Sequence, residues 1–168
     1  MNARGDNNAM ERARVYIETS IPSFYCTTRS DPESIARRNW TREWWDTRRG
    51  EYEVVTSAAA LDELRKWSYA GSTDALALMA EVRLVPVEAA VMEIVEAYVR
   101  HHVMPTDPRG DALHLALASY HQCEFLLTWN CRHLANANKF RHIRRVNTML
   151  GLYVPALVTP MELLGVEP

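Results

Sequence analysis

Three acidic residues occupy positions from which the chain could hold a metal ion. Glu18 follows the apolar run at residues 14–17, Glu63 lies in the helical pattern after the run at 52–56, and Asp111 opens a later helical pattern at 111–122. Carboxylates that gather at one point repel one another and need a cation to stay ionised together. Oxygen-only ligands favour a hard ion such as Mg²⁺ or Mn²⁺. These acids therefore predict a divalent metal site.

Two of these acids also have a purely structural interpretation as helix caps. Glu18 could cap the helix that begins near Pro22, and Asp111 could satisfy the free amides at the start of its own helix. An acid at a helix start is also favoured by the helix dipole. Taken one at a time, these positions leave both interpretations open.

Helical geometry selects Glu63 as the remaining acid. At 100° per residue, Glu63 borders the side of its helix that faces the sheet, whereas Asp62 points away with Arg65. Glu63 is therefore the candidate ligand, although it could instead pair with Lys66 or with the indole of Trp67. The sheet-facing side itself is expected to carry Ala60, Leu64 and Trp67.

The elements that must position these acids follow from the apolar pattern. Short apolar runs predict strands, and longer segments free of proline predict helices. Their alternation is typical of βαβ units, so we expect an α/β fold, a mainly parallel sheet with helices on both faces. The expected strands are 14–17, 52–56, 83–87, 124–128 and 156–159, and the expected helices are 33–49, 58–69, 73–81, 88–102, 111–122 and 139–150.

Polar side chains follow the first and fourth expected strands. Thr19 and Ser20 come after the first, and Thr128 and Asn130 come after the fourth. In an open parallel sheet the ligand site lies beyond the carboxyl ends of the strands. We therefore expect these residues to face the same crevice as the acids.

The histidines have no spacing that completes a zinc site and are interpreted as core or surface residues: His101, His102, His114, His121 and His133.

Length and composition indicate one domain in a reducing compartment. The 168 residues are 48% hydrophobic and 24% charged, which is usual for a globular domain. Residues 1–13 lack apolar periodicity and are expected to be a disordered lead, with a single domain at 14–168. Three cysteines without a CxxC pair argue against a disulfide framework, and no apolar run could span a membrane. We expect a cytoplasmic protein.

The charge is unevenly distributed. Nineteen basic and 21 acidic residues give a net charge of −2, yet no acid lies between Glu124 and Glu162. This stretch is interpreted either as a surface for a nucleic-acid backbone or as an ordinary solvated face. Its basic residues are Arg132, Lys139, Arg141, Arg144 and Arg145.

Tryptophans at helical spacing mark the expected helix 33–49. Trp40 and Trp44 lie four residues apart, with Trp45 beside them and arginines interleaved. Such a stripe is typical of a core-facing side, but it could also form a surface for a second copy or another protein. Both interpretations stay open at this point.

Four motifs in order resemble those of PIN-domain proteins, and in particular the VapC-type toxins of type II toxin-antitoxin systems. They are VYIETSIP at 15–22, VTSAAALDEL at 55–64, GDALHLALA at 110–118 and FLLTWNCRHLAN at 125–136; LVTPMELL at 157–164 matches one subgroup. The resemblance covers about residues 14–164. It implies a three-layer α/β/α ribonuclease that uses Mg²⁺ or Mn²⁺ to hydrolyse RNA, forms a homodimer and is neutralised by an antitoxin.

The resemblance also assigns roles to residues. Glu18, Glu63 and Asp111 match the first three acids of the family site and would be metal ligands, while the fourth acid falls at Asn130. Two departures stand out: the first position is commonly Asp rather than Glu, and the fourth is commonly Asp rather than neutral Asn. Thr19, Ser20 and Thr128 would orient water, phosphate or the ligands. The alternatives are a catalytically weakened RNA-binding module and a PIN-like nuclease that acts on DNA.

Overall fold

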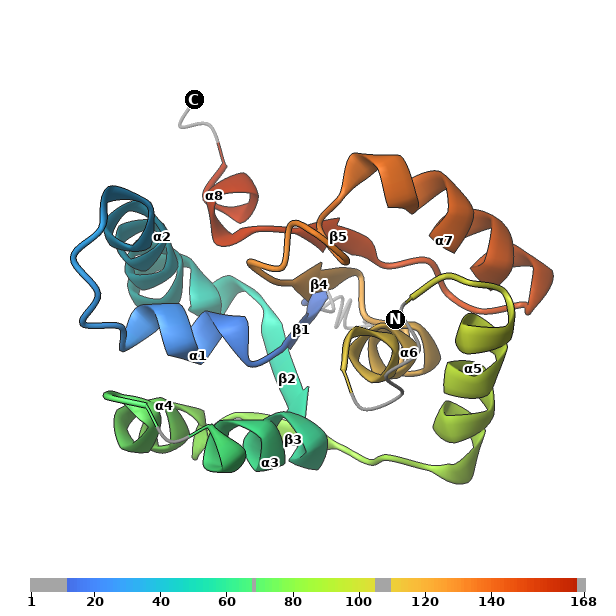
Figure 1. Cartoon of the computed structure of the whole chain (residues 1–168), viewed down its shortest axis with the longest axis horizontal. Helices are drawn as coiled ribbons and strands as arrows, with labels where there is room; N and C mark the ends of the chain where they lie inside the picture. The colour runs from blue at the N-terminus through green and yellow to red at the C-terminus, as the bar shows by residue number, and fades with distance from the viewer. Residues whose placement is uncertain (1–11, 68, 105–109, 166–168) are drawn as a thin grey trace, which may run out of the picture.

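The central sheet of the protein is wholly parallel. The computed structural model describes residues 12–67, 69–104 and 110–165. Within them the chain forms one five-stranded sheet with the order β3-β2-β1-β4-β5 (Figure 1). Its strands are β1 (Arg14–Ile17), β2 (Glu53–Ser57), β3 (Arg83–Val85), β4 (Phe125–Leu127) and β5 (Ala156–Val158).

The strand order places a crevice next to β1. The chain runs outward from β1 through β2 to β3 and then returns to β4 on the other side of β1. Such a reversal of direction between two neighbouring strands opens a ligand crevice at their carboxyl ends. Tyr16 is in register with Val55 and with Leu126, and Ile17 is in register with Leu127. The polar residues that follow β1 and β4 therefore leave the sheet side by side.

Helices cover both faces of the sheet and make the molecule a three-layer sandwich (Figure 1). One side carries α1 (Ser20–Tyr25), α2 (Pro32–Glu43), α3 (Ala58–Lys66), α4 (Ser72–Met79) and α8 (Pro160–Leu163), together with the short turns η1 (Trp44–Arg48) and η2 (Arg49–Glu51). The other side carries α5 (Ala89–Arg100), α6 (Asp111–Tyr120) and α7 (Ala137–Met149). This confirms the α/β fold expected from the sequence.

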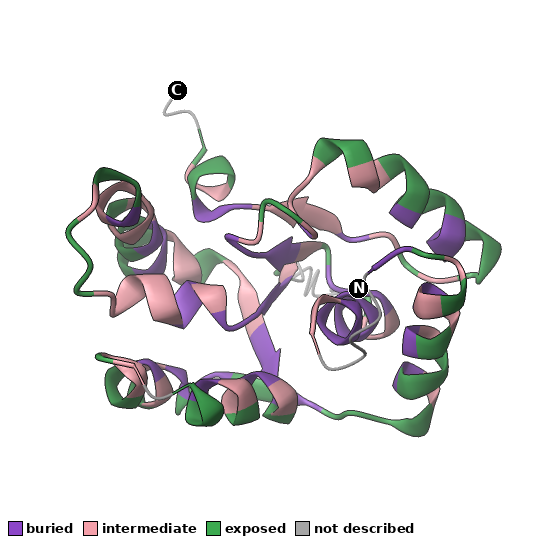
Figure 2. Ribbon diagram, viewed as in Figure 1, coloured by how far each residue is buried: buried purple, intermediate pink, exposed green. Residues whose placement is uncertain are grey.

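Successive side chains of a strand point to opposite faces of the sheet, so the core has two halves. Val15 and Ile17 pack with α2, α3 and α4, whereas Tyr16 between them packs with α5, α6 and α7. On β4, Leu126 and Leu127 divide in the same way. Figure 2 shows α6 buried along almost its whole length, because it lies between the sheet and the two outer helices. The helix that begins with Asp111 is thus held on every side.

A buried polar network also anchors α6. The hydroxyl group of Tyr98 on α5 donates to Asn147 Oδ1 on α7 at 2.6 Å and lies 3.1 Å from Ser119 Oγ on α6. The amide of Asn147 donates in turn to Ser119 Oγ at 2.9 Å. Burial raises the pKa of Tyr98 to about 12, so its proton stays in place at neutral pH. Three helices are therefore fixed relative to one another.

The tryptophans of residues 33–49 belong to the core, as one of the two interpretations held. Trp44 is fully buried and Trp45 is only 6% exposed. Consecutive residues of an α-helix point 100° apart, so burying two such large rings in succession requires contacts over a wide arc of the helix. The chain changes here from α2 to a π-helical turn at Trp44–Arg48, and both indoles enter the core. Trp40 packs on the same cluster and stacks on Trp129 at 6.0 Å.

The remaining sequence predictions concern the N-terminal residues, the cysteines and membrane-spanning segments. The lead expected at residues 1–13 lies almost wholly outside the described residues, and β1 begins at Arg14. Cys26, Cys123 and Cys131 are free thiols. Across the described ranges, no helix has the length and apolar character needed to cross a membrane.

Gly71, in the turn between α3 and α4, provides a test of the packing beside the site. Its φ is +103°, and an added Cβ would lie 2.9 Å from the carbonyl oxygen of Cys26. Gly71→Ala should therefore lower the free energy of unfolding by about 1–3 kcal/mol, measured by urea denaturation. Gly50→Ala is the matched control because nothing lies within 4 Å of the added atom. Equal stability of the two variants would contradict the strained contact.

Candidate active site

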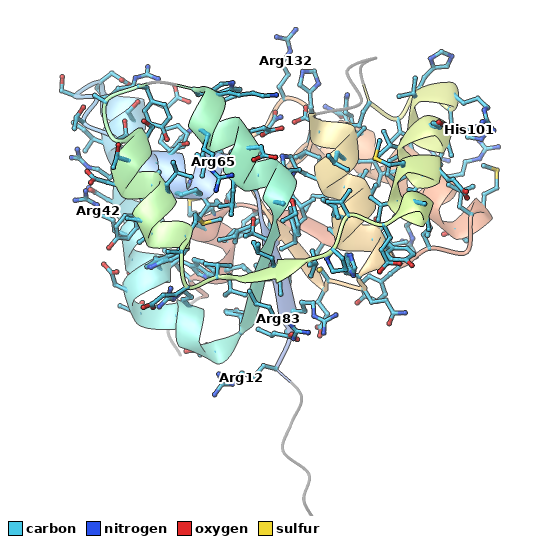
Figure 3. All side chains as sticks on the ribbon, turned by 90° about the horizontal axis from the view of Figure 1, so that it is seen from below. Arg12, Arg42, Arg65, Arg83, His101 and Arg132 are labelled. Atoms are coloured by element: carbon cyan, nitrogen blue, oxygen red, sulfur yellow. The ribbon has the colours of Figure 1, made fainter. Side chains whose placement is uncertain are left out.

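A pocket of about 630 Å³ lies where the carboxyl ends of β1 and β4 meet α3 and α6. Figure 3 shows the edge concerned: Arg12 and Arg83 mark the side where strands begin, and Arg132 lies on the opposite side, where they end. All three predicted acids line this pocket, together with Asn130. The structure therefore brings the predicted ligands into one place.

Glu18 is held by the start of α1. Its side chain is only 5% exposed, and its carboxylate accepts a hydrogen bond from the backbone N–H of Ser20 at 3.0 Å and another from the hydroxyl group of Ser20. The capping interpretation is thus partly correct, because Ser20 is the first residue of α1. Ser20 Oγ also accepts from the backbone N–H of Trp129 at 2.8 Å, which joins the ends of β1 and β4.

Thr19 connects two of the acids. Its hydroxyl oxygen lies 3.2 Å from Glu18 Oε2 and 3.3 Å from Glu63 Oε2. A single hydroxyl hydrogen is shared between these two carboxylates, so each interaction is only partial. Two carboxylate oxygens are nevertheless held within reach of one point.

Glu63 has a buried partner on the other side. His114 Nε2 lies 3.2 Å from Glu63 Oε2, and His114 Nδ1 lies 2.9 Å from the hydroxyl group of Tyr16. Tyr16 is in turn 2.9 Å from Ser57 Oγ, which accepts from the backbone N–H of Ala60 at 3.4 Å. A line of hydrogen bonds thus runs from the first turn of α3, through β1, to the acid on the same helix.

The chemistry of these groups determines which one is the donor in each of these hydrogen bonds. An ionised Glu63 can only accept, so the proton facing it is carried by His114 Nε2. When the imidazole is neutral, Tyr16 donates to Nδ1 and Ser57 donates to Tyr16; when it is protonated, both bonds reverse. In either state the bond to Glu63 persists.

The surroundings of His114 favour its charged form despite burial. Burial alone lowers the pKa of His114, but the hydrogen bond and charge of Glu63, with the more distant charges of Glu18 and Asp111, raise it above its ordinary value overall. Burial raises the pKa of Tyr16, so this hydroxyl group stays protonated. Both groups are thus suited to hold the carboxylate of Glu63 in one orientation.

Asp111 is not used as a helix cap. The N-cap of α6 is Gly110, and the carboxylate of Asp111 accepts a hydrogen bond from Asn130 Nδ2 at 2.7 Å. Asn130 is itself fixed, because its Oδ1 accepts from the backbone N–H of His133 at 3.0 Å and its own N–H donates to Thr128 Oγ1 at 2.8 Å. Asn130 therefore aims Asp111 into the pocket.

The donor set fits a hard divalent cation. Glu18 is buried and Asp111 is half-buried, yet neither forms an ion pair within the described part of the chain. Such carboxylates are stabilised by a cation, and Glu18, Glu63 and Asp111 are the side chains that would hold it. The three do not converge on one point, since Glu18 and Glu63 share Thr19 while Asp111 faces Asn130. No preformed group of three such ligands occurs in residues 12–67, 69–104 and 110–165.

The predicted basic residues lie apart from the acids. None of them lines the pocket. Lys139 Nζ lies 3.4 Å from Nδ1 of His133, a residue of the pocket wall. Arg132 is exposed after β4, and Arg141, Arg144 and Arg145 are exposed on α7. Their expected contact with nucleic acid stays a prediction.

Two features of the pocket were not expected. His114 was interpreted as an ordinary core residue; its position three residues after Asp111, on the same helical face, is the signal that points to the site. Trp67 was placed on the sheet-facing side of its helix with Leu64. That placement is wrong, because α3 ends at Lys66 and Trp67 turns outward with φ −90° and ψ 87°.

The fold has a counterpart among solved structures. It is similar to that in the crystal structure of FitAcB from Neisseria gonorrhoeae, with a TM-score of 0.51 and 17% sequence identity over 87% of this chain and 97% of that chain. At this identity the likeness concerns the fold alone, and it supports the PIN-like three-layer arrangement. No protein-family profile matches the sequence, and no curated protein matches it either.

The hydrogen bonds behind Glu63 can be tested through stability. Tyr16→Phe keeps the ring but removes the hydroxyl group that bonds Ser57 Oγ and His114 Nδ1 in the core. The free energy of unfolding should therefore fall by about 1–3 kcal/mol. Tyr25→Phe is the matched control, since it removes an exposed hydrogen bond to Asp46. Thermal and urea unfolding measure both. A Tyr16→Phe protein as stable as Tyr25→Phe would contradict the buried network.

Proposed function

We propose that this protein is a PIN-type metal-dependent endoribonuclease that hydrolyses RNA phosphodiester bonds with Mg²⁺ or Mn²⁺. The presence of Glu18, Glu63 and Asp111 in the lining of one pocket at the end of a parallel sheet is the observation that carries the proposal. The sequence motifs around these acids and the fold likeness to FitAcB support it. The proposal needs no protein nucleophile.

The cation and the side chains of the protein would have separate roles in the reaction. A divalent ion held by these acids would supply a polarised water and neutralise charge that develops on the phosphate. The side chains around it set the geometry: His114 holds Glu63, Asn130 holds Asp111, and Thr19 and Ser20 hold Glu18. Outer partners of this kind fix ligand orientation and affect metal affinity by roughly 10- to 100-fold.

We extend the proposal to the partners of a VapC-type toxin. These are an RNA substrate, a second copy of the chain in a homodimer, and an antitoxin protein that covers the site. The exposed arginines of α7 would contact the RNA backbone, and such contacts weaken as salt rises. The basic residues concerned are Arg132, Lys139, Arg141, Arg144 and Arg145.

A second candidate function is an RNA-binding PIN module with little or no turnover. Asn130 favours it, because this residue gives an amide hydrogen to Asp111 and adds no negative charge to the pocket. A third candidate retains the metal chemistry but acts on DNA. Cleavage assays with both nucleic acids separate the three.

Asp111→Asn provides the decisive test. Purified protein should cut a labelled mixed RNA pool with Mn²⁺ or Mg²⁺ and not with EDTA, and Asp111→Asn should reduce the rate by about 100-fold or more, because it removes a charged ligand. Asp62→Asn is the matched control, since Asp62 is exposed and pairs with Arg65. Full activity in Asp111→Asn would overturn the assignment. Cleavage of DNA alone would favour the third candidate.

Replacing Asn130 by an acid tests whether this residue lies within reach of the proposed cation. Asn130→Asp places two carboxylates at hydrogen-bond distance, so without metal the free energy of unfolding should fall by about 1–3 kcal/mol. Added Mn²⁺ should restore the lost stability more strongly than in the unmodified protein, because a fourth charged ligand strengthens cation binding. Thermal unfolding with and without Mn²⁺ measures both effects. Identical Mn²⁺ responses would show that residue 130 lies outside the reach of the cation.

A further inference from the structure

We propose that Trp67 forms a stacking site for an unpaired nucleobase beside the acids, with Lys66 contacting the adjoining phosphate. This inference rests on the proposed function, because it assigns a part of the substrate to the same pocket. It adds a recognition element that the acids do not provide: a flat apolar surface at the pocket wall.

The exposure of Trp67 sets it apart from the other tryptophans. Its side chain is 60% exposed, whereas Trp44, Trp45 and Trp129 are at most 6% exposed. Those three and Trp40 all take part in contacts between aromatic rings. Within the described ranges, no such contact involves Trp67. The indole of Trp67 is thus an exposed flat apolar ring in the lining of the pocket, where a ligand can contact it.

The backbone holds Trp67 at a fixed position relative to the acids. Its N–H donates to the carbonyl oxygen of Glu63 at 3.1 Å, so the ring begins one helical turn after a predicted metal ligand. Further along, the hydroxyl group of Tyr69 lies 2.8 Å from Oγ of Ser23, another residue of the pocket wall. The segment that carries Trp67 is thus tied to the pocket on both sides.

The charges around the ring favour a nucleotide as the ligand. Lys66 is exposed, lines the same pocket and has no ion pair within the part of the chain that the structure describes. An aromatic face beside a cation is the combination that binds single-stranded nucleic acids, with the base on the ring and the backbone on the charge. A nucleotide carries a base and a phosphate in this adjacency, and the pocket that Lys66 and Trp67 line is also lined by the three acids.

Stacking on Trp67 has two consequences for the choice of substrate. A base inside a duplex has both faces covered by its neighbours, so the site accepts only an unpaired base. A purine covers more of the indole than a pyrimidine does, so sequence preference follows stacking strength. The site should therefore bind adenine-rich single strands more tightly than uracil-rich ones.

Binding measured without cleavage tests the inference. The full chain carrying Asp111→Asn is titrated into fluorescein-labelled oligoadenylate, oligouridylate and an RNA duplex at low salt, and anisotropy reports the affinity. Adding Trp67→Leu should weaken oligoadenylate binding by roughly 5- to 100-fold, while Trp67→Phe should lose less, because a smaller ring still stacks. The preference for oligoadenylate over oligouridylate should also diminish.

Tyr153→Leu is the matched control. Tyr153 is an exposed aromatic residue outside the pocket, so its loss should leave all three affinities unchanged. Trp67 is exposed, so its replacement should leave the midpoint of thermal unfolding unchanged, which shows that the variant is folded.

Three outcomes would overturn the stacking site. They are unchanged affinity in Trp67→Leu, equal losses in Tyr153→Leu, and equal losses for the duplex and the single strands. Unchanged affinity with intact metal-dependent cleavage in the unmodified chain would retain the nuclease and reject the stacking site. Weakened binding in Trp67→Leu without any cleavage by the unmodified chain would retain the stacking site and reject the nuclease.

Discussion

Repulsion between carboxylates at the end of a buried sheet is the constraint that organises this part of the molecule. Glu18, Glu63 and Asp111 line one pocket. Each is held by a different donor: the first turn of α1 for Glu18, the His114 imidazole for Glu63 and the Asn130 amide for Asp111. These donors stabilise the ionised acids, and the acids that they orient are the groups that would hold the proposed cation.

The parallel topology explains why the acids meet although they are far apart in sequence. Because β1 lies between β2 and β4, the segments after β1 and β4 emerge at one edge, and α3 and α6 pass beside it. The two halves of the core then fix these helices, α3 against one face of the sheet and α6 against the other. Glu63 and Asp111 thus approach the pocket from opposite faces, and β1 carries Glu18 between them.

Much of this could be predicted from the sequence, because it depends on local patterns. The strand at 14–17 and the start of the helix at Asp111 follow from apolar runs and match the structure. The ends of helices were less predictable: α3 stops at Lys66 although its pattern continues, and residues 33–49 divide into α2, a π-helical turn and a 3₁₀ turn. The six residues of α1 and the four of α8 are too short for a periodic pattern to mark them.

For the site too, features that depend on local sequence patterns could be predicted, and features that depend on tertiary packing could not. That the acids would lie together follows from strand order and helix position, both of which leave traces in the sequence. Their partners do not: Thr19 meets Glu63 across 44 positions, and His114 meets Glu63 across 51, through packing that no local pattern records. The orientation of Asn130 is a further case. The motif resemblance presents it as a missing charge, whereas in the structure it donates a hydrogen bond to Asp111 and avoids the repulsion that a fourth acid would add. In the proposed metal site an acid at this position would strengthen cation binding and lower the metal-free stability, whereas the amide favours metal-free stability at the expense of cation binding.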